Sequence, residues 1–546
     1  MNKATKTKFP FIFWLVIFFE FIERGSYYGV MSVLSVYFTE ILNFSKQDVG
    51  IIKSTIQPIL YFLPIVAGAL ADKYGYRKTL MVAFTFLGIG YLLTSQVTSY
   101  ALVFIFLCVM ALGAGTFKPI ISGTIAKVTD ETNSSLGFGI FYWSINLGAF
   151  IVPLVIVPIL KSISWNYILI FAGVSTGLMI IPTILFYKDV ETKQQTTEKK
   201  DLLKTIANAF EITYSPVILL YHLYRKSNTY QYIITIFLGL FLGYSLYLYF
   251  RLSVYVLFYI VFLIILSFVR LIFKGYENQN SSAKLYAMIF YALGFIVILS
   301  FAPTIYAKIL SSVIYLTVLS LNLIEINDKE KFVDHAKFLS LIGIYSGFWV
   351  LYFQMFDSVL WYVRDYVDAA QLNNFVNGII ASVGLNLQWQ FDIEHVTVIN
   401  AFTIILLQLI ISKIVANFKA LPTMMAGIML GTIGMFLLSL SASIWVFMLG
   451  IFIFSIGEMT AHPKFISYIG QIAPVERKAM YMGYIFLYGV IGSSIGGVLG
   501  ANLYVIFVDQ MKQPNILWLI FSSIGLITVI GLYLFNKFVK FKIASK

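Results

Sequence analysis

The stretch EFIERGSYY, residues 20–28, places three charged side chains inside a segment that otherwise has the composition of a membrane span. The nine residues before it are all apolar, and the apolar pattern resumes afterwards. A charged side chain in mid-bilayer costs about 2.5–3.5 kcal/mol on insertion scales, so it usually has a partner and a function. At helical spacing Glu20, Arg24 and Tyr27 share one face, with Glu23 beside it. We therefore expect a proton and substrate relay facing the interior of a helical bundle.

The composition predicts an all-α polytopic membrane protein. Hydrophobic residues make up 60% of the 546 residues and charged residues only 12%, against roughly 25% charged in soluble proteins. Runs of about 20 apolar residues, the length that crosses a bilayer as a helix, follow one another along the chain. The single cysteine, Cys108, leaves no disulfide framework and no cysteine-based metal site.

The net charge of +13 is distributed as in a membrane protein and does not indicate a nucleic-acid partner. Basic residues cluster in short loops and near both ends, while alternate loops hold few. This positive-inside pattern predicts a multi-pass protein of the cytoplasmic (inner) membrane with both termini in the cytoplasm, and anionic lipid is a sufficient partner for the charges. The clusters include Lys3, Lys6, Lys73, Arg77, Lys413, Lys419, Arg477, Lys478, Lys540 and Lys542.

The apolar runs divide the chain into two halves and an insert. Residues 1–187 are expected to form one six-helix bundle and residues 338–546 a second, with a cytoplasmic linker and inserted transmembrane helices at 188–337. Two six-span halves around a central linker are the plan of major facilitator transporters. The expected spans are 11–39, 48–71, 78–97, 100–125, 137–160, 166–187, 338–363, 395–415, 422–441, 443–470, 479–505 and 513–537.

The insert contains four further apolar segments between residues 230 and 325. Because both of its flanks are expected in the cytoplasm, it must cross the membrane an even number of times. Two crossings give 14 spans in all and four give 16, and we favour four. Lipid-facing scaffold or partner-docking helices are the expected role of this segment.

Several motifs resemble those of known families. The segment 68–78, GALADKYGYRK, resembles the cytoplasmic loop motif of the major facilitator superfamily, in which Gly75 would permit a tight turn. The pattern Glu-x-x-Glu-Arg-x-x-Tyr-Tyr-Gly at 20–29 resembles the signature of the proton-dependent oligopeptide transporter family. Further matches to this family are Tyr-x-x-Pro-x-x-x-Gly from Tyr61, a glycine-rich segment ending at Lys118, Phe-Tyr-x-x-Ile-Asn-x-Gly at 141–148, Phe348-Trp349 with Gln354, Asn400, and Glu458 with Pro463.

The chemistry of a zwitterionic peptide agrees with this resemblance. A peptide needs a cation for its carboxylate, an anion for its amino end, and amides or phenols between them. The resemblance assigns Lys118 and Arg24 to the carboxylate and Glu458 to the amino end. The expected substrate-binding residues are Arg24, Tyr27, Tyr28, Tyr61, Lys118, Tyr142, Asn146, Trp349, Gln354, Asn400, Glu458 and His462. The alternative role for His462 is that of a neutral packing residue, and the alternative for the tyrosines is packing in the protein core.

Proton coupling is expected at Glu20, Glu23, Arg24 and Glu458. In this hypothesis a protonated glutamate frees Arg24 to engage the substrate, and deprotonation recaptures it. Purely structural ion pairs are the alternative for these residues.

Two positions depart from the family pattern. Many members have an arginine where this chain has Met31 and an acid where it has Phe353, and in the family these two groups face each other at the outer gate. Asp357, one turn beyond Phe353, could take part of the role of that acid. By default, however, four charged residues are expected on a solvated rim at the outer mouth of the seventh span: Asp357, Arg364, Asp365 and Asp368.

The sequence therefore predicts a proton-coupled symporter that imports dipeptides and tripeptides, with protons as coupling ion and no other cofactor. It is not expected to be an enzyme, because we find no nucleotide-binding loop, metal cluster or nucleophile–base set. One alternative is a relative that carries an amino acid, nitrate or a peptide-like drug. Another is a transport-inactive sensor or assembly subunit.

Overall fold

The computed structural model describes residues 9–129, 133–189, 329–473 and 478–539. The chain divides into two compact units, residues 1–209 with 340–546 and residues 210–339. Both predicted six-helix halves fall largely in the first unit. The four apolar segments of the insert lie outside the described residues, so the number of its crossings stays a prediction.

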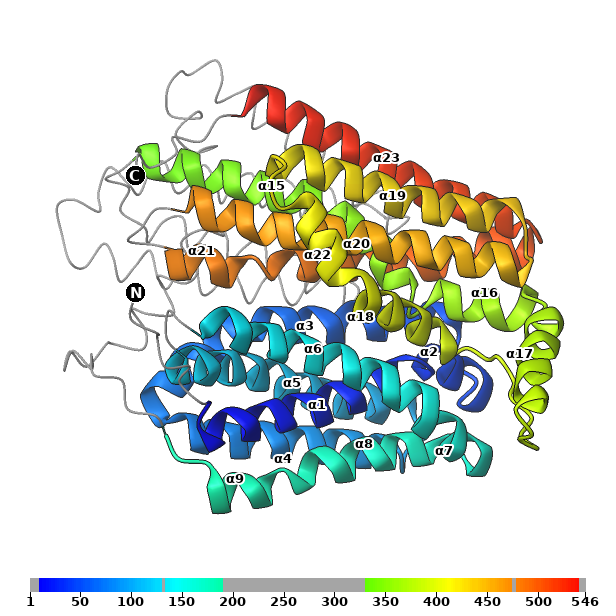
Figure 1. The fold of residues 1–546 in the computed structure, drawn as a ribbon, viewed down its shortest axis with the longest axis horizontal. Helices are drawn as coiled ribbons and strands as arrows, with labels where there is room; N and C mark the ends of the chain where they lie inside the picture. The colour runs from blue at the N-terminus through cyan, green and yellow to red at the C-terminus, as the bar shows by residue number, and fades with distance from the viewer. Residues whose placement is uncertain (1–8, 130–132, 190–328, 474–477, 540–546) are drawn as a thin grey trace, which may run out of the picture. The chain divides into compact units, whose positions relative to one another are not determined.

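The first half contains helices at all six predicted spans (Figure 1). Ser45 begins α3 as its N-cap, because its hydroxyl accepts a hydrogen bond from the backbone N–H of Asp48 at 3.1 Å. Gly75 separates α3 from α4 with φ +92°, so the expected tight turn is present at a backbone angle that favours glycine. The elements are α1 (Phe11–Met31), α2 (Leu34–Val36), η1 (Tyr37–Ile41), α3 (Lys46–Tyr74), α4 (Tyr76–Thr94), α5 (Tyr100–Val128), α6 (Ser134–Ile151), η2 (Val152–Ile156), α7 (Val157–Ile163), α8 (Asn166–Leu178) and α9 (Ile180–Phe186).

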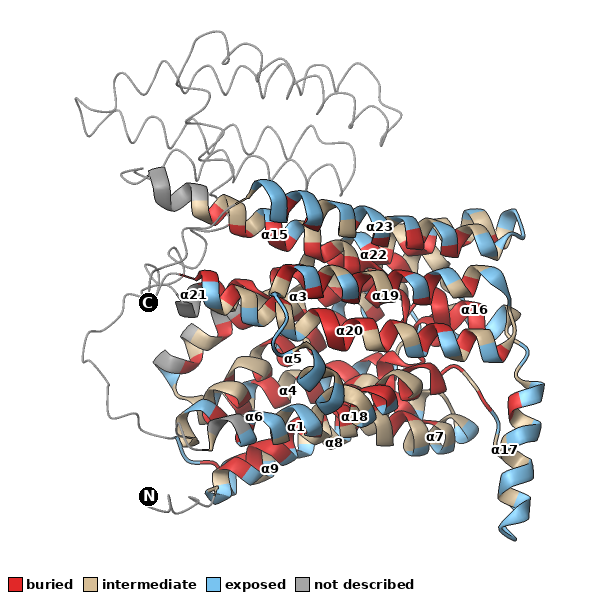
Figure 2. Ribbon diagram, turned by 45° about the horizontal axis from the view of Figure 1, so that its top comes forward, coloured by how far each residue is buried: buried red, intermediate tan, exposed pale blue. Residues whose placement is uncertain are grey.

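The second half likewise has helices at its six predicted spans, and a turn at residues 485–486 divides the span 479–505 into α21 and α22. The seventh predicted span is broken after Gln354 into α15 and α16, and residues 355–357 between them form a turn. A helix that the sequence analysis did not predict, α17, stands away from the bundle and is largely exposed (Figure 2). The elements are α15 (Lys329–Gln354), α16 (Ser358–Tyr366), α17 (Ala370–Ser382), α18 (His395–Val415), α19 (Ala420–Leu440), α20 (Ile444–Ile472), α21 (Lys478–Tyr484), α22 (Leu487–Leu503), η4 (Tyr504–Gln510) and α23 (Pro514–Phe538).

Nine helical segments of the described chain are long and apolar enough to cross a membrane. The helix α1 is not among them, because it contains three charged residues, Glu20, Glu23 and Arg24. The observed helices confirm the predicted all-α membrane fold.

The main helix contacts between the halves are those of α22 with α3 and of α18 with α6. The first contact is close because glycines face each other. A Cβ added to Gly50 of α3 would lie 2.6 Å from the carbonyl oxygen of Gly497 in α22. Small residues that allow such approach are a common basis of helix association in membranes. The remaining surface between the halves encloses the candidate site.

Candidate functional site

A cavity of about 270 Å³ lies between the two halves of the first unit. Helices α1, α3, α5 and α6 line it from the first half, and α15, α18, α20 and α22 from the second. Its walls combine apolar and aromatic side chains with a small number of charged and amide groups, which is typical of a small-molecule site. The cavity is therefore the candidate functional site.

Helix α1 carries a buried charge cluster at the first wall of the cavity. Glu20, Glu23 and Arg24 are 3%, 1% and 6% exposed. The Arg24 guanidinium is in direct contact with the Glu23 carboxylate and lies 3.6 Å from Oε1 of Glu20. Oε2 of Glu20 and Oε1 of Glu23 accept no hydrogen bond from the described residues. Two carboxylates thus share one guanidinium. Each of them has one oxygen that can still bind a proton or accept a hydrogen bond.

Lys118 supplies a second cation from α5. Its ammonium nitrogen lies 4.5 Å from the centroid of the Tyr61 ring, at the distance of a cation–π contact. Among the described residues no carboxylate forms an ion pair with it. An anionic ligand in the cavity would therefore meet an ammonium group that no carboxylate of the described chain neutralises.

Glu458 provides the anion of the opposite wall, from α20. Its Oε2 accepts a hydrogen bond from Nδ2 of Asn400 at 3.1 Å, and the same amide nitrogen donates to Oγ of Ser455 at 2.9 Å. No cation of the described chain forms an ion pair with Glu458. The wall of the first half thus holds the cations Arg24 and Lys118 together with the carboxylate of Glu20, and the wall of the second half holds an anion with an amide donor.

An aromatic cluster surrounds His462, one helical turn after Glu458. Nδ1 of His462 lies 3.3 Å from the hydroxyl of Tyr345, within hydrogen-bond distance. The rings of Trp349 and Tyr488 lie 5.1 and 5.3 Å from the imidazole, and these two rings stack at 4.2 Å. This cluster forms an apolar wall beside the anion.

The structure brings most of the predicted site residues to the cavity, and their roles toward a substrate stay predictions. Three of them lie elsewhere. Glu23 does not line the cavity and contacts Arg24. Tyr27 donates a hydrogen bond from its hydroxyl to Oε1 of Gln57 at 2.9 Å. Gln354 is fully buried, and its amide donates to backbone carbonyls of α15 and α22, which gives it a packing role. The predicted residues that line the cavity are Glu20, Arg24, Tyr28, Tyr61, Lys118, Tyr142, Asn146, Trp349, Asn400, Glu458 and His462.

The default expectation of a solvated rim is wrong for Asp357. Arg364, Asp365 and Asp368 are exposed, but Asp357 is 5% exposed and lies 3.2 Å from the ammonium of Lys53. The turn after α15 directs its carboxylate toward the first half, away from solvent. The sequence analysis missed Lys53, although a lysine within an otherwise apolar span is the same signal that identified Lys118.

The model of the Major Facilitator Superfamily matches residues 13–385 and 366–540. The chain belongs to this superfamily. Solved structures support the same fold: a peptide transporter POT in complex with sulfate aligns with a TM-score of 0.62 at 18% identity, over 97% of this chain and 94% of that one. An auto-inhibited POT family peptide transporter aligns with a TM-score of 0.66 at 15% identity, over 98% and 99%. At these identities the likeness shows the major facilitator fold alone.

Sequence relatives agree with the oligopeptide transporter motifs. Dipeptide and tripeptide permease B of Aliivibrio fischeri is 30% identical over 198 residues, which is 36% of this chain and 39% of the relative. Solute carrier family 15 member 2 of Danio rerio is 29% identical over 201 residues, 34% of this chain and 28% of the relative. The matched region thus spans about two fifths or less of each relative. These partial matches agree with the resemblance to the oligopeptide transporters, whereas the family model shows the superfamily.

Proposed function

We propose that this major facilitator protein is a proton-coupled symporter that imports dipeptides and tripeptides by alternating access. The observation that carries the proposal is that the cations lining the cavity come from the first half, whereas Glu458 lies on the opposite wall. The first half contributes Lys118 and Arg24, and the second half contributes Glu458 with Asn400. A zwitterionic peptide would bridge the two halves, its carboxylate toward the cations and its ammonium toward Glu458. Such bridging couples substrate binding to movement of one half relative to the other.

The aromatic cluster supports a substrate with variable side chains. Trp349 and Tyr488 present ring surface that accepts side chains of different size without demanding a particular hydrogen bond. Tyr28 and Tyr142 contribute phenols to the same cavity. Peptides that share a backbone and differ in side chain would suit this combination of fixed charges and apolar walls.

The α1 cluster supports the coupling step. When Glu20 or Glu23 takes up a proton, it loses most of its attraction for Arg24, so the guanidinium becomes free to bind the carboxylate of the peptide. After the substrate leaves, release of the proton restores the pair. One proton taken up on one side and released on the other would thereby be linked to movement of a peptide.

Uptake of labelled dialanine into proteoliposomes tests the proposal. An inward proton gradient should drive accumulation above the equilibrium level, and a protonophore should abolish this accumulation. Other dipeptides and tripeptides should compete, whereas free alanine should not. If a folded sample accumulates no peptide under a gradient, the peptide symporter is refuted. A thermal-shift screen of amino acids, nitrate and peptide-like drugs then tests the alternative substrates, and peptide binding without flux indicates a transport-inactive sensor.

A further inference from the structure

Helix α17 lies at the end of the spans that the positive-inside distribution predicts to face away from the cytoplasm, here called the outer end. In Figure 1 and in Figure 2 it runs across the direction of the spans, so its axis is roughly parallel to the expected plane of the membrane. Its 13 residues have a length of about 20 Å. The helix thus has the position and the direction of an element at the surface of the bilayer.

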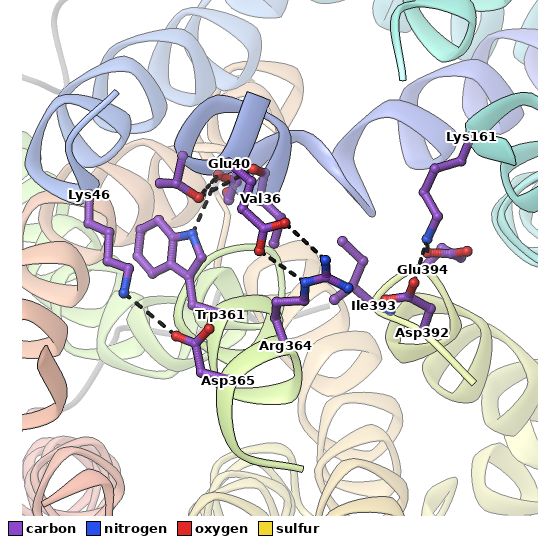
Figure 3. Close-up of polar contacts among 12 residues, drawn as sticks. Val36, Glu40, Lys46, Lys161, Trp361, Arg364, Asp365, Asp392, Ile393 and Glu394 are labelled. Carbon is purple, nitrogen blue, oxygen red and sulfur yellow. Dashed lines mark hydrogen bonds and ion pairs between the residues drawn. The ribbon is translucent and has the colours of Figure 1, made fainter. Parts of the chain in front are cut away.

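Ion pairs hold the chain on both sides of α17 (Figure 3). Before the helix, Arg364 of α16 pairs with Glu40 at 3.0 Å. After it, the carboxylate of Asp392 lies 2.9 Å from the ammonium of Lys161, which also pairs with Glu394. Because both flanks are attached to the first half, the segment between them stays at the outer end of the spans.

One face of α17 binds the chain that returns towards α18. Oδ1 of Asn377 accepts a hydrogen bond from the backbone N–H of Trp389 at 2.7 Å, and Nδ2 of Asn377 donates to the carbonyl oxygen of Trp389 at 2.9 Å. Oδ1 of Asn373 accepts a hydrogen bond from the backbone N–H of Phe391 at 2.8 Å. The two asparagines are one helical turn apart, so this face of α17 has its partners within the protein.

The opposite face of α17 is apolar and exposed. Phe375, Ile379 and Val383, the last directly after the end of the helix, follow one another at intervals of four residues and are 58%, 52% and 67% exposed. We call these three side chains the α17 stripe. Phe375 and Ile379 each come two residues after an asparagine of the first face, which is about 200° around the helix. Residues 369–391 contain no charged side chain.

The α17 stripe begins against an exposed apolar side of α20. The ring of Phe375 lies 6.0 Å from that of Trp445, edge to face, and Nε1 of Trp445 donates to Oε1 of Gln371 at 3.0 Å. Leu449 and Phe452 follow Trp445 on the same side of α20, and the three are 48%, 39% and 44% exposed, respectively. The exposed apolar side of a membrane span faces lipid, and tryptophans are enriched at headgroup level. The stripe therefore continues a lipid-facing surface at its outer end.

We propose that the α17 stripe inserts into the outer leaflet of the membrane, so that α17 lies in the interface as an amphipathic helix. The partner of this face is a lipid surface with neutral headgroups, because residues 369–391 have no charge that would attract anionic lipid. Insertion removes three large apolar side chains from water, while the asparagine face keeps its hydrogen bonds to the returning chain. This inference concerns the membrane and does not depend on the substrate.

Spin-label accessibility on the full chain tests the proposal. Cys108→Ser removes the native thiol, and a nitroxide is attached either at Ile379→Cys on the stripe or at Ala381→Cys, which is also exposed but lies about 200° around the helix. The protein is reconstituted at one copy per phosphatidylcholine nanodisc. Power saturation then compares collisions with oxygen, which concentrates in lipid, and with a water-soluble nickel chelate. The ratio of oxygen to nickel accessibility should be about fivefold or more higher at Ile379→Cys than at Ala381→Cys.

The lipid composition gives a second readout. Replacement of about a third of the phosphatidylcholine by phosphatidylglycerol should change the ratio at Ile379→Cys by less than about twofold, because the segment is uncharged. A ratio that rises only with the anionic lipid would overturn the proposal.

Two other results would also overturn it. Equal accessibility to the nickel chelate at both positions would mean that the stripe faces water. Low accessibility of the Ile379→Cys label to both reagents would mean that protein covers the stripe. In that case, a short distance between labels in nanodiscs that hold two copies would identify a second copy of the chain as the partner.

Discussion

Replacement of Lys118 by glutamine tests how the cavity recognises a carboxylate. No carboxylate of the described chain forms an ion pair with this ammonium, so the substitution removes a cation and leaves no protein anion without its partner. A hydrogen bond to a charged group contributes about 1.5–3 kcal/mol. Because about 1.4 kcal/mol corresponds to a factor of ten, Lys118→Gln should raise the Kd of a dipeptide roughly 10- to 150-fold.

Isothermal titration calorimetry of the purified protein with dialanine and with dialanine amide provides the assay. The amide lacks the negative charge, so Lys118→Gln should weaken binding of dialanine strongly and binding of the amide by less than a factor of three. Lys127→Gln is the matched control, because Lys127 belongs to the same helix and also lies over a tyrosine ring, that of Tyr76 at 3.6 Å, but does not line the cavity. It should leave both affinities unchanged.

Two results would refute this reasoning. Equal weakening of the acid and the amide by Lys118→Gln would mean that the lysine shapes the cavity and does not read the carboxylate. An unchanged Kd for dialanine in a variant with the parent's melting temperature would remove Lys118 from the site altogether.

Three further predictions concern other charges. Glu458→Gln should weaken binding of dialanine about tenfold or more and leave N-acetyl-dialanine unaffected in the same calorimetric assay, since only the former has an ammonium group. Glu20→Gln should keep counterflow exchange of labelled dialanine but lose accumulation under a proton gradient, and full accumulation would contradict its role in coupling. Burial raises the pKa of Asp392, but Lys161 and hydrogen bonds outweigh this effect and hold that pKa below its usual value, whereas burial holds the pKa of Glu394 above its usual value. The contribution of Asp392 to stability is therefore present at neutral pH and is lost as the pH falls through its lowered pKa. The decrease in melting temperature caused by Lys161→Met should accordingly be largest near pH 7 and become smaller towards pH 3. An equal decrease at both pH values would contradict the role of the ion pair.

The membrane spans were predictable because they depend on local composition. An apolar run of about 20 residues must become a helix in a bilayer, where every backbone hydrogen bond has to be made within the segment. The same local reasoning identified Glu20, Arg24, Lys118 and Glu458, since a charge in such a run is conspicuous whatever surrounds it. All four of these residues line the cavity.

The local argument was insufficient where a partner lies far away in the chain. The sequence analysis expected Gln354 at the substrate, but the fold places its amide against α22. It favoured a solvated rim for Asp357, whereas the turn after α15 carries this residue to Lys53. It did not consider Lys53, and the partner of this lysine lies 304 residues further along the chain, beyond the reach of a local argument.

By itself, the sequence determined the class of the protein, the positions of its described spans, and that Glu20, Arg24, Lys118 and Glu458 lie within those spans. Hydrophobicity and helical period act within a few turns, so these features need no knowledge of the rest of the chain. Only the tertiary structure decided which charges meet. Ser35 and Asp357 are 322 residues apart in sequence and 2.7 Å apart between their oxygen atoms. That contact exists because the two halves pack against each other, and close packing between halves is a property of the whole fold.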